Sequence, residues 1–330
     1  MILTTTRRTA LLLGVAALAA PAALRASPAL DAVIAEAEGL NQLHSFQILR
    51  DGVVVQAIAP RGPGLDRLAN IKSVSKTLVA LLTGIAIAEG AIPGPDARVL
   101  PLLGRPAAGD VRDDLTVGDL LSMRTGLPST SGPRYGAWVQ SGDWVSYVLD
   151  ADPTGRPGTG FTYSTGGWHV LGAVLARATG QSLHALARSR LADPLDIALP
   201  RWDRDPQGRY LGGNQMALTP RGLARIGEMV RNGGRHDGRQ IVPEAWIVTS
   251  WEPRARSPWS GDGYGYGWFL TRMGGARAAY GRGYGGQVLA VVPDRGLTMV
   301  ITSDPTRPAR TAGHFGDLMR LMRAAVETQG

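Results

Sequence analysis

The stretch Asn70-Ile71-Lys72-Ser73-Val74-Ser75-Lys76 leads directly into residues 77–89, a nearly continuous apolar run that ends at Gly90. Such a run predicts a helix that is buried on all sides. Ser73 and Lys76 stand three positions apart at its start, so the helix places the hydroxyl and the amine on one face. Apolar surroundings lower the pKa of a lysine, which can then take a proton from serine. The spacing predicts a serine nucleophile, and its alternative is a solvated helix start with an incidental lysine.

Predicted strands lie at both ends of the chain, and predicted helices lie between them. The strands are residues 45–50 and 53–59, which flank the hairpin signal Asp51-Gly52, and residues 266–271, 287–292 and 297–302. The helices are residues 27–43, 116–123, 168–178, 181–191, 219–232, 243–250 and 314–327. This order predicts an α/β (α+β) fold in which strands from both termini form one antiparallel sheet flanked by helices. Residues 27–330 are expected to form a single domain, with residues 91–250 as a mostly helical subdomain.

The first 26 residues have the layout of an export signal. Arg7-Arg8 precedes a short apolar run, residues 10–20, and small residues follow it. The apolar run is shorter than the roughly 20 residues that span a bilayer. The paired arginines resemble a twin-arginine signal, and an ordinary secretory signal is the alternative. We therefore expect an exported protein, periplasmic or extracellular, without membrane insertion once the signal is removed.

The composition of the 330 residues excludes several classes of function. There is no cysteine, so disulfides, thiolate nucleophiles and cysteine-based zinc sites are ruled out. The net charge is +8, but the arginines are scattered and form no stripe, so we predict no nucleic-acid partner. The five histidines show no ligand spacing, and no Gly-x-Ser-x-Gly or His-Glu-x-x-His motif occurs. No metal and no organic cofactor is implied, and a homodimer is compatible with the composition.

Two further segments could carry chemistry. Tyr163 lies in Phe161-Thr162-Tyr163-Ser164-Thr165-Gly166-Gly167, a loop at the head of a predicted helix. Near an ammonium its phenol tends toward phenolate and could act as a general base, whereas in isolation it would be a packing residue. The segment Gly281-Arg282-Gly283-Tyr284-Gly285-Gly286-Gln287 enters a strand and not a helix, which argues against dinucleotide binding. Close backbone approach to a ligand explains its glycines, with a twisted edge strand as the alternative.

Other positions are candidates for the wall of a substrate pocket. Asn214, in Gly212-Gly213-Asn214-Gln215, either lines the pocket or forms a turn. Trp144 is one of several aromatic residues that could contact an apolar acyl or short amide substrate, although such residues also build hydrophobic cores. His169 could reach the mouth of a cleft, but a buried structural role is the simpler interpretation.

Together these segments resemble the serine β-lactamase and penicillin-binding-protein-like hydrolases. The resemblance is closest to the branch of class C β-lactamases, family VIII esterases and 6-aminohexanoate-dimer hydrolase. Its carriers are Ser73-Val74-Ser75-Lys76, Leu121-Ser122-Met123-Arg124-Thr125-Gly126, the stretch from Pro157-Gly158 through Tyr163-Ser164-Thr165-Gly166, Asp193-Pro194-Leu195, Leu218-Thr219-Pro220-Arg221, Tyr264-Gly265-Tyr266-Gly267-Trp268 and Gly283-Tyr284-Gly285-Gly286-Gln287. It implies a β-lactamase/transpeptidase-like fold.

The resemblance also implies roles for individual residues. Ser73 is implied as the nucleophile, and Lys76 and Tyr163 as the groups that activate it and relay its proton. The oxyanion hole is implied to be the backbone N–H groups of Ser73 and Tyr284. Gly283, Gly285, Asn214, Trp144 and Thr165 are the candidates for substrate binding.

The sequence departs from the β-lactamase pattern where the substrate would be held. Thr165 stands where a Tyr-x-Asn motif has asparagine, and Gly283-Tyr284-Gly285 stands where Lys-Thr-Gly or His-Thr-Gly supplies a cation. Arg282 and Arg277 are merely nearby, so a β-lactam would lose its usual carboxylate clamp. The sequence therefore predicts an exported serine hydrolase that acts through an acyl-enzyme on carboxylic esters or short linear amides. A β-lactamase or D-alanyl-D-alanine carboxypeptidase, and a non-catalytic penicillin-binding-like module, are the alternatives.

Overall fold

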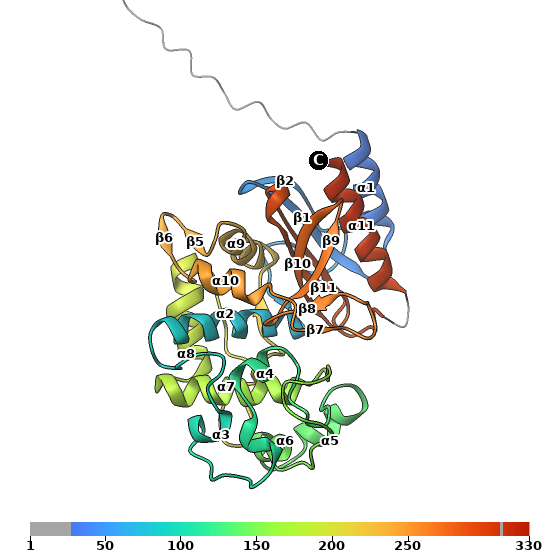
Figure 1. The fold of residues 1–330 in the computed structure, drawn as a ribbon. Helices are drawn as coiled ribbons and strands as arrows, with labels where there is room; N and C mark the ends of the chain where they lie inside the picture. Colours follow the sequence, from blue (N-terminus) through green and yellow to red (C-terminus); the bar gives the residue numbers. More distant parts are fainter. Residues whose placement is uncertain (1–27, 311–312, 330) are drawn as a thin grey trace, which may run out of the picture.

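The computed structural model describes residues 28–310 and 313–329, and Figure 1 shows its fold. The predicted export signal, residues 1–26, lies outside the described residues. In the described part of the chain, eight strands form one sheet in the order β2-β1-β12-β11-β10-β9-β8-β7. The strands are β1 (Leu43–Arg50), β2 (Val53–Ile58), β7 (Ala255–Arg256), β8 (Gly263–Tyr264), β9 (Phe269–Met273), β10 (Ala276–Gly283), β11 (Gln287–Val292) and β12 (Leu297–Ser303).

The first and last strands of the described chain, β1 and β12, lie next to each other in this sheet. β1 pairs antiparallel with β12, with Ile48 opposite Met299, and on its other side β1 pairs with β2. Asp51 and Gly52 connect β1 to β2, and both have positive φ, 47° and 82°. Two such residues in a row match the twist of a two-residue hairpin. The predicted antiparallel sheet from both termini is confirmed.

Helices cover both faces of the sheet. On one face lie α1 (Pro28–Gly39) and α11 (His314–Thr328), side by side (Figure 1). On the other lie α2 (Ser75–Ala88), α9 (Pro220–Arg231) and α10 (Glu244–Ser250). Beyond α2 is a helical layer made of α3 (Val99–Leu102), α4 (Val117–Leu121), α5 (Tyr135–Val139), α6 (Trp144–Leu149), α7 (Thr165–Thr179) and α8 (Leu183–Ala187).

The helical layer ends earlier than residue 250, the predicted limit of the helical subdomain. α9 packs directly on β11 and β12, because Gly227 leaves room for the side chains of Leu289 and Thr298. α10 packs on α2, where the indole of Trp246 donates to the Ala80 carbonyl at 2.9 Å. Both helices therefore belong with the sheet.

α2 is the central helix of the fold, as its apolar sequence predicts. Its residues from Ser75 to Ala86 are all buried, between the sheet on one side and α7 on the other. A short 3₁₀ turn, η1 (Lys72–Val74), precedes it and carries Ser73. Residues 70–76, which contain Ser73 and Lys76, are thus held at the boundary between the sheet and the helical layer.

β10 is the longest strand that the sequence pattern did not predict. Its sequence, ARAAYGRG, is rich in small residues with low strand propensity, and it is a strand because it pairs with β9 and β11 on its two sides. A Cβ at Gly281 would lie 2.5 Å from the Thr77 hydroxyl, and one at Gly283 would lie 2.5 Å from the Ile71 carbonyl. These glycines therefore let β10 lie against η1 and α2.

Two helical glycines, one in a crowded position and one in an open position, offer a test of how the helices pack. A Cβ at Gly84 in α2 would lie 2.1 Å from Cδ1 of Trp246, whereas one at Gly316 in α11 meets nothing within 4 Å. We expect Gly84→Ala to lower the free energy of unfolding by about 1–3 kcal/mol through overpacking. Gly316→Ala should raise it by about 0.5–1 kcal/mol, because alanine favours the helix. Urea unfolding measures both, and equal effects of the two variants would contradict this packing.

Candidate active site

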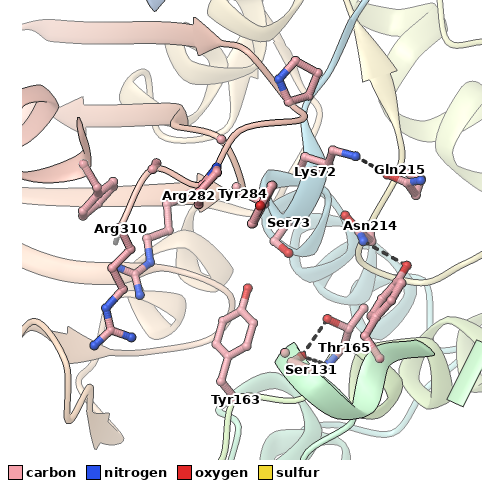
Figure 2. Close-up of a pocket in the computed structure, with 18 residues that line it drawn as sticks. Lys72, Ser73, Ser131, Tyr163, Thr165, Asn214, Gln215, Arg282, Tyr284 and Arg310 are labelled. Carbon is pink, nitrogen blue, oxygen red and sulfur yellow. Dashed lines mark hydrogen bonds between the residues drawn. The ribbon is translucent and has the colours of Figure 1, made fainter. Parts of the chain in front are cut away.

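The turn that carries Ser73 has an unusual backbone. Lys72, the residue before it, has φ of +49°, a left-handed conformation that side-chain-bearing residues seldom adopt. The side chain of Asn70 stabilises this turn, because its oxygen accepts the Lys72 N–H at 2.9 Å. The turn presents the Ser73 hydroxyl to a cavity, as Figure 2 shows. Strained backbone of this kind is often found at functional sites.

Lys76 lies beneath Ser73 with three hydrogen-bond partners. Its Nζ is 2.9 Å from Ser73 Oγ, 2.8 Å from the Gly213 carbonyl oxygen and 3.3 Å from Thr165 Oγ1. The side chain is buried, and this burial lowers the pKa of Lys76 from 10.5 to about 7. A large fraction of the amine is therefore neutral near pH 7 and can accept a proton.

The segment of residues 212–218 runs beside the nucleophile segment and holds it at several points. Ala217 and Leu218 (β4) pair with Asn70 and Ala69 (β3). The Met216 carbonyl accepts the Ile71 N–H at 3.0 Å, and the Gln215 side chain accepts from the Lys72 ammonium at 3.0 Å. Together with the bond from Gly213 to Lys76, these contacts fix Ser73 relative to its base.

Tyr163 faces Ser73 from the opposite wall (Figure 2). Its loop is fixed by two contacts with backbone carbonyls, Ser129 Oγ to Tyr163 O at 2.6 Å and Thr162 N to Met123 O at 2.8 Å. Nζ of Lys76 lies 5.1 Å from the centre of the Tyr163 ring.

Burial raises the pKa of Tyr163, while its hydrogen bond with Ser73 and the charge of Arg282 act in the opposite direction. The net direction is upward, so the group is a neutral phenol and the predicted tendency toward phenolate is wrong. Desolvation of the anion outweighs the nearby positive charge.

The cavity in front of Ser73 has a volume of about 540 Å³ and lies where the sheet meets the helical layer. Most of the residues predicted for the site line it: Ser73, Tyr163, Thr165, Asn214, Gly283, Tyr284 and Gly285. Asn214 is held there by the hydroxyl of Tyr135, which its side-chain nitrogen contacts at 3.2 Å. Residues that the sequence did not suggest also line it: Lys72, Ser131, Gly132, Tyr135, Gln215, Pro305, Pro308, Ala309, Arg310 and Phe315.

Trp144 does not line the cavity, so its prediction as a substrate-binding residue is wrong. It is buried in α6, where its ring packs against Trp138 and His169 with centroid distances of 5.2 and 5.3 Å. Its indole N–H donates to the Val139 carbonyl at 3.1 Å. The aromatic composition of the chain does not distinguish a pocket wall from a core.

Arg282, which the sequence placed merely nearby, lines the cavity. Its guanidinium lies over the rings of Phe269 and Phe315, 4.5 and 4.9 Å from their centres. Arg310 lies on the same side, opposite Lys72 (Figure 2). Among the described residues that line the cavity there is no aspartate or glutamate. Arg277, by contrast, lies outside it and approaches Asp294 at 3.8 Å.

Between residues 28 and 310 and from 313 to 329, no group of three or more histidine, aspartate or glutamate side chains is placed to hold a metal ion. In that same part of the chain, none of the helices combines the length and apolar character that crossing a bilayer requires.

Curated proteins are similar to this chain in sequence over part of its length. The 6-aminohexanoate-dimer hydrolase of Paenarthrobacter ureafaciens is 26% identical over 242 residues, which are 67% of this chain and 60% of that protein. Esterase EstB of Burkholderia gladioli is 32% identical over 171 residues, 43% of this chain and 41% of that one. The chain therefore spans less than two thirds of the length of either relative.

Solved structures share the fold. EstCE1, a hydrolase with promiscuous acyltransferase activity, superposes with a TM-score of 0.73 at 18% identity, over 92% of this chain and 98% of that one. A penicillin-binding protein homologue from Caulobacter crescentus gives 0.72 at 20% identity over the same shares. The family model described as Beta-lactamase matches residues 44–318, most of the length of this protein. The chain belongs to the beta-lactamase family.

Proposed function

We propose that this protein is an exported serine hydrolase that forms an acyl-enzyme on Ser73 and acts on carboxylic esters or short linear amides. The observation that carries the proposal is the buried amine of Lys76, 2.9 Å from Ser73 Oγ, with a pKa of about 7. The relatives named as an esterase and as a 6-aminohexanoate-dimer hydrolase support the substrate class. Export rests on the layout of residues 1–26.

The partners of Lys76 orient it as a base. A neutral amine has two N–H groups and one lone pair. The Gly213 carbonyl can only accept, so it takes one N–H, and Thr165 Oγ1 takes the other. The lone pair then faces Ser73 Oγ and accepts the serine proton as Oγ attacks the substrate carbonyl carbon.

The rest of the cycle returns each group to its starting state. The backbone N–H groups of Ser73 and Tyr284 stabilise the oxyanion of the tetrahedral intermediate. The bond from the acyl carbon to the leaving oxygen or nitrogen breaks, and that atom takes the proton that Lys76 received, relayed by the neutral phenol of Tyr163. Water then attacks the acyl-Ser73 ester, Lys76 accepts its proton, and the acid leaves as Ser73 regains its hydroxyl.

The test is a reaction with p-nitrophenyl acetate, followed by nitrophenol release and by the intact mass of the quenched protein. We expect a burst of nitrophenol and a protein carrying one acetyl group, located by peptide mapping on Ser73. Nitrophenol release no faster than that of the Ser73→Ala variant, together with no adduct at any quench time, would contradict the proposal. That result would favour the non-catalytic module.

Arg282 favours a second candidate function, hydrolysis of substrates that carry a carboxylate, which include β-lactams and D-alanyl peptides. It lines the cavity together with Arg310 and Lys72, and no described lining residue opposes their charge. A guanidinium can bind a carboxylate through two parallel hydrogen bonds. This arrangement supplies a cation that the sequence pattern alone did not locate in the site.

Two substrates of equal chain length measure this preference. The mono-p-nitrophenyl ester of adipic acid ends in a carboxylate, and p-nitrophenyl hexanoate ends in a methyl group. We expect Arg282→Gln to lower kcat/KM for the adipate ester by about 10- to 100-fold, the value of a hydrogen bond to a charged group, and to leave the hexanoate ester nearly unchanged. Arg277→Gln is the matched control. Equal losses on both esters, or no hydrolysis of the adipate ester and of nitrocefin by the wild type, would exclude the second function.

A further inference from the structure

A second buried polar group lies behind the catalytic residues. His169 is on α7, fully buried, four residues after Thr165, which contacts Lys76. Its Nε2 is 3.1 Å from Asp205 Oδ2, and its Nδ1 is 3.3 Å from the backbone nitrogen of Gly212. The rings of Trp138 and Trp144 pack against it and exclude water.

Asp205 fixes the tautomer of this histidine. Asp205 Oδ1 accepts the backbone N–H of Arg209 at 2.7 Å, and Asp205 Oδ2 accepts the side-chain Nε–H of Arg209 at 2.6 Å. These donors, together with His169, keep the pKa of Asp205 below its usual value despite its desolvation, so Asp205 is ionised. Burial lowers the pKa of His169, which is therefore neutral. A neutral ring that donates from Nε2 to the carboxylate has an unprotonated Nδ1, which accepts the Gly212 N–H.

The Gly212–Gly213 turn connects this pair to the base. Gly213 has φ of +107°, and a Cβ there would lie 2.8 Å from the Trp168 side chain and 2.9 Å from Cγ of Lys76. A Cβ at Gly212 would lie 2.4 Å from the Trp168 carbonyl oxygen. The turn is thus confined between α7 and Lys76, and His169 of α7 accepts the Gly212 N–H at 3.3 Å.

We propose that His169, held by Asp205, is a positioning residue for Lys76: it fixes the Gly212–Gly213 turn so that the Gly213 carbonyl holds one N–H of the amine and aims the lone pair at Ser73. This inference rests on the proposed function, in which Lys76 is the base. The charged groups that face His169 are Asp205 and, beyond it, Arg209 and Asp143. Around the amine lie Ser73, Thr165, the Gly213 carbonyl and the ring of Tyr163.

The proposal predicts the direction of a pH effect. A carbonyl stabilises an ammonium more than a neutral amine, so a displaced Gly213 carbonyl lowers the pKa of Lys76 further. His169→Phe keeps a ring that packs on the tryptophans but removes the acceptor. We expect kcat to fall roughly 10- to 100-fold, KM to change little, and the acid limb of the kcat/KM profile to move to lower pH.

A conservative variant and a stability control separate positioning from general destabilisation. In His169→Asn the side-chain oxygen stands at the same covalent distance from Cβ as Nδ1, so it can accept the Gly212 N–H and should restore part of kcat and the position of the limb. Leu321→Ala creates a cavity in α11, on the other face of the sheet, and should lower Tm without moving the limb. Asp205→Asn removes the charge that fixes the tautomer of His169. We expect it to lower kcat and to shift the acid limb to lower pH, both by less than His169→Phe does.

The experiment measures kcat/KM and kcat for p-nitrophenyl acetate from pH 5 to 9 in the four variants and the wild type. An unmoved limb and an unchanged kcat in folded His169→Phe would overturn the proposal, whatever its Tm. If His169→Phe does not fold, the proposal would be overturned by an Asp205→Asn variant whose kcat and acid limb are those of the wild type. A wild type without an acid limb near pH 7 and without an acyl adduct would instead refute the proposed function itself.

Discussion

Ser73→Ala is expected to lower kcat for p-nitrophenyl acetate by on the order of 10⁴-fold or more and to abolish the acetyl adduct. The reason is that Ser73 Oγ is the atom that faces both the cavity and the amine of Lys76, 2.9 Å away. Loss of a covalent nucleophile removes the acyl-enzyme route, and what activity remains reflects binding and oxyanion stabilisation alone. Stopped-flow absorbance and intact mass measure the two effects together.

Ser75→Ala is the matched control, because it removes a hydroxyl two residues away. The Ser75 hydroxyl donates to the Lys72 carbonyl at 2.6 Å and accepts the Met216 N–H at 3.3 Å. Both of its partners are backbone groups, and the side chain is buried. We expect this variant to lose some stability and to keep the burst and the adduct. Retention of both by Ser73→Ala, or their loss only in Ser75→Ala, would show that the nucleophile is misassigned.

The parts of the fold that the sequence predicted depend on local patterns. Short segments rich in apolar and β-branched residues mark β1, β11 and β12, and the Asp51-Gly52 turn sets the hairpin. β10 escaped prediction because its alanines and glycines carry no strand signal. Its conformation follows from pairing with β9 and β11 on its two sides. It also follows from the approach of its glycines to η1 and α2, which are segments about 200 residues away in the chain.

The same distinction separates the predicted and unpredicted parts of the site. Ser73 and Lys76 are three positions apart, so local helical geometry brings them together without help from the rest of the chain. The Gly213 carbonyl is a backbone group and leaves no mark in a residue pattern. Ser131, Tyr135 and Arg310 reach the cavity from segments whose paths are set by distant packing. Trp144 was misplaced for the same reason, since only the tertiary contacts put it beside His169.

Lys76→Met is expected to lower kcat/KM by about 10³- to 10⁴-fold and to remove the acid limb of the pH profile. In the wild type the active form is the neutral amine, whose pKa is about 7, so activity should rise as pH increases through 7 and level off above it. Methionine fills the same space without a lone pair for the Ser73 proton. Lys72→Met is the control: its ammonium contacts Gln215 at 3.0 Å, and we expect the limb to persist in that variant. A limb near pH 7 that survives in Lys76→Met would assign the base to another group.

The same substitution should make the protein more stable, and this effect has its own pH dependence. The pKa of Lys76 is about 7 in the folded protein, below its ordinary value of 10.5, because burial disfavours the ammonium. Below pH 7 folding must bury a charge, and between pH 7 and 10.5 the unfolded chain binds more protons, so the stability of the wild type rises with pH across that window. Lys76→Met is free of this cost. Its Tm should exceed that of the wild type by several degrees at pH 6, with the gap narrowing toward pH 10. A lower Tm for Lys76→Met at pH 6 would mean that the three hydrogen bonds of the amine outweigh its desolvation, whereas a higher one would show that the fold gives up stability to keep a reactive lysine beneath Ser73.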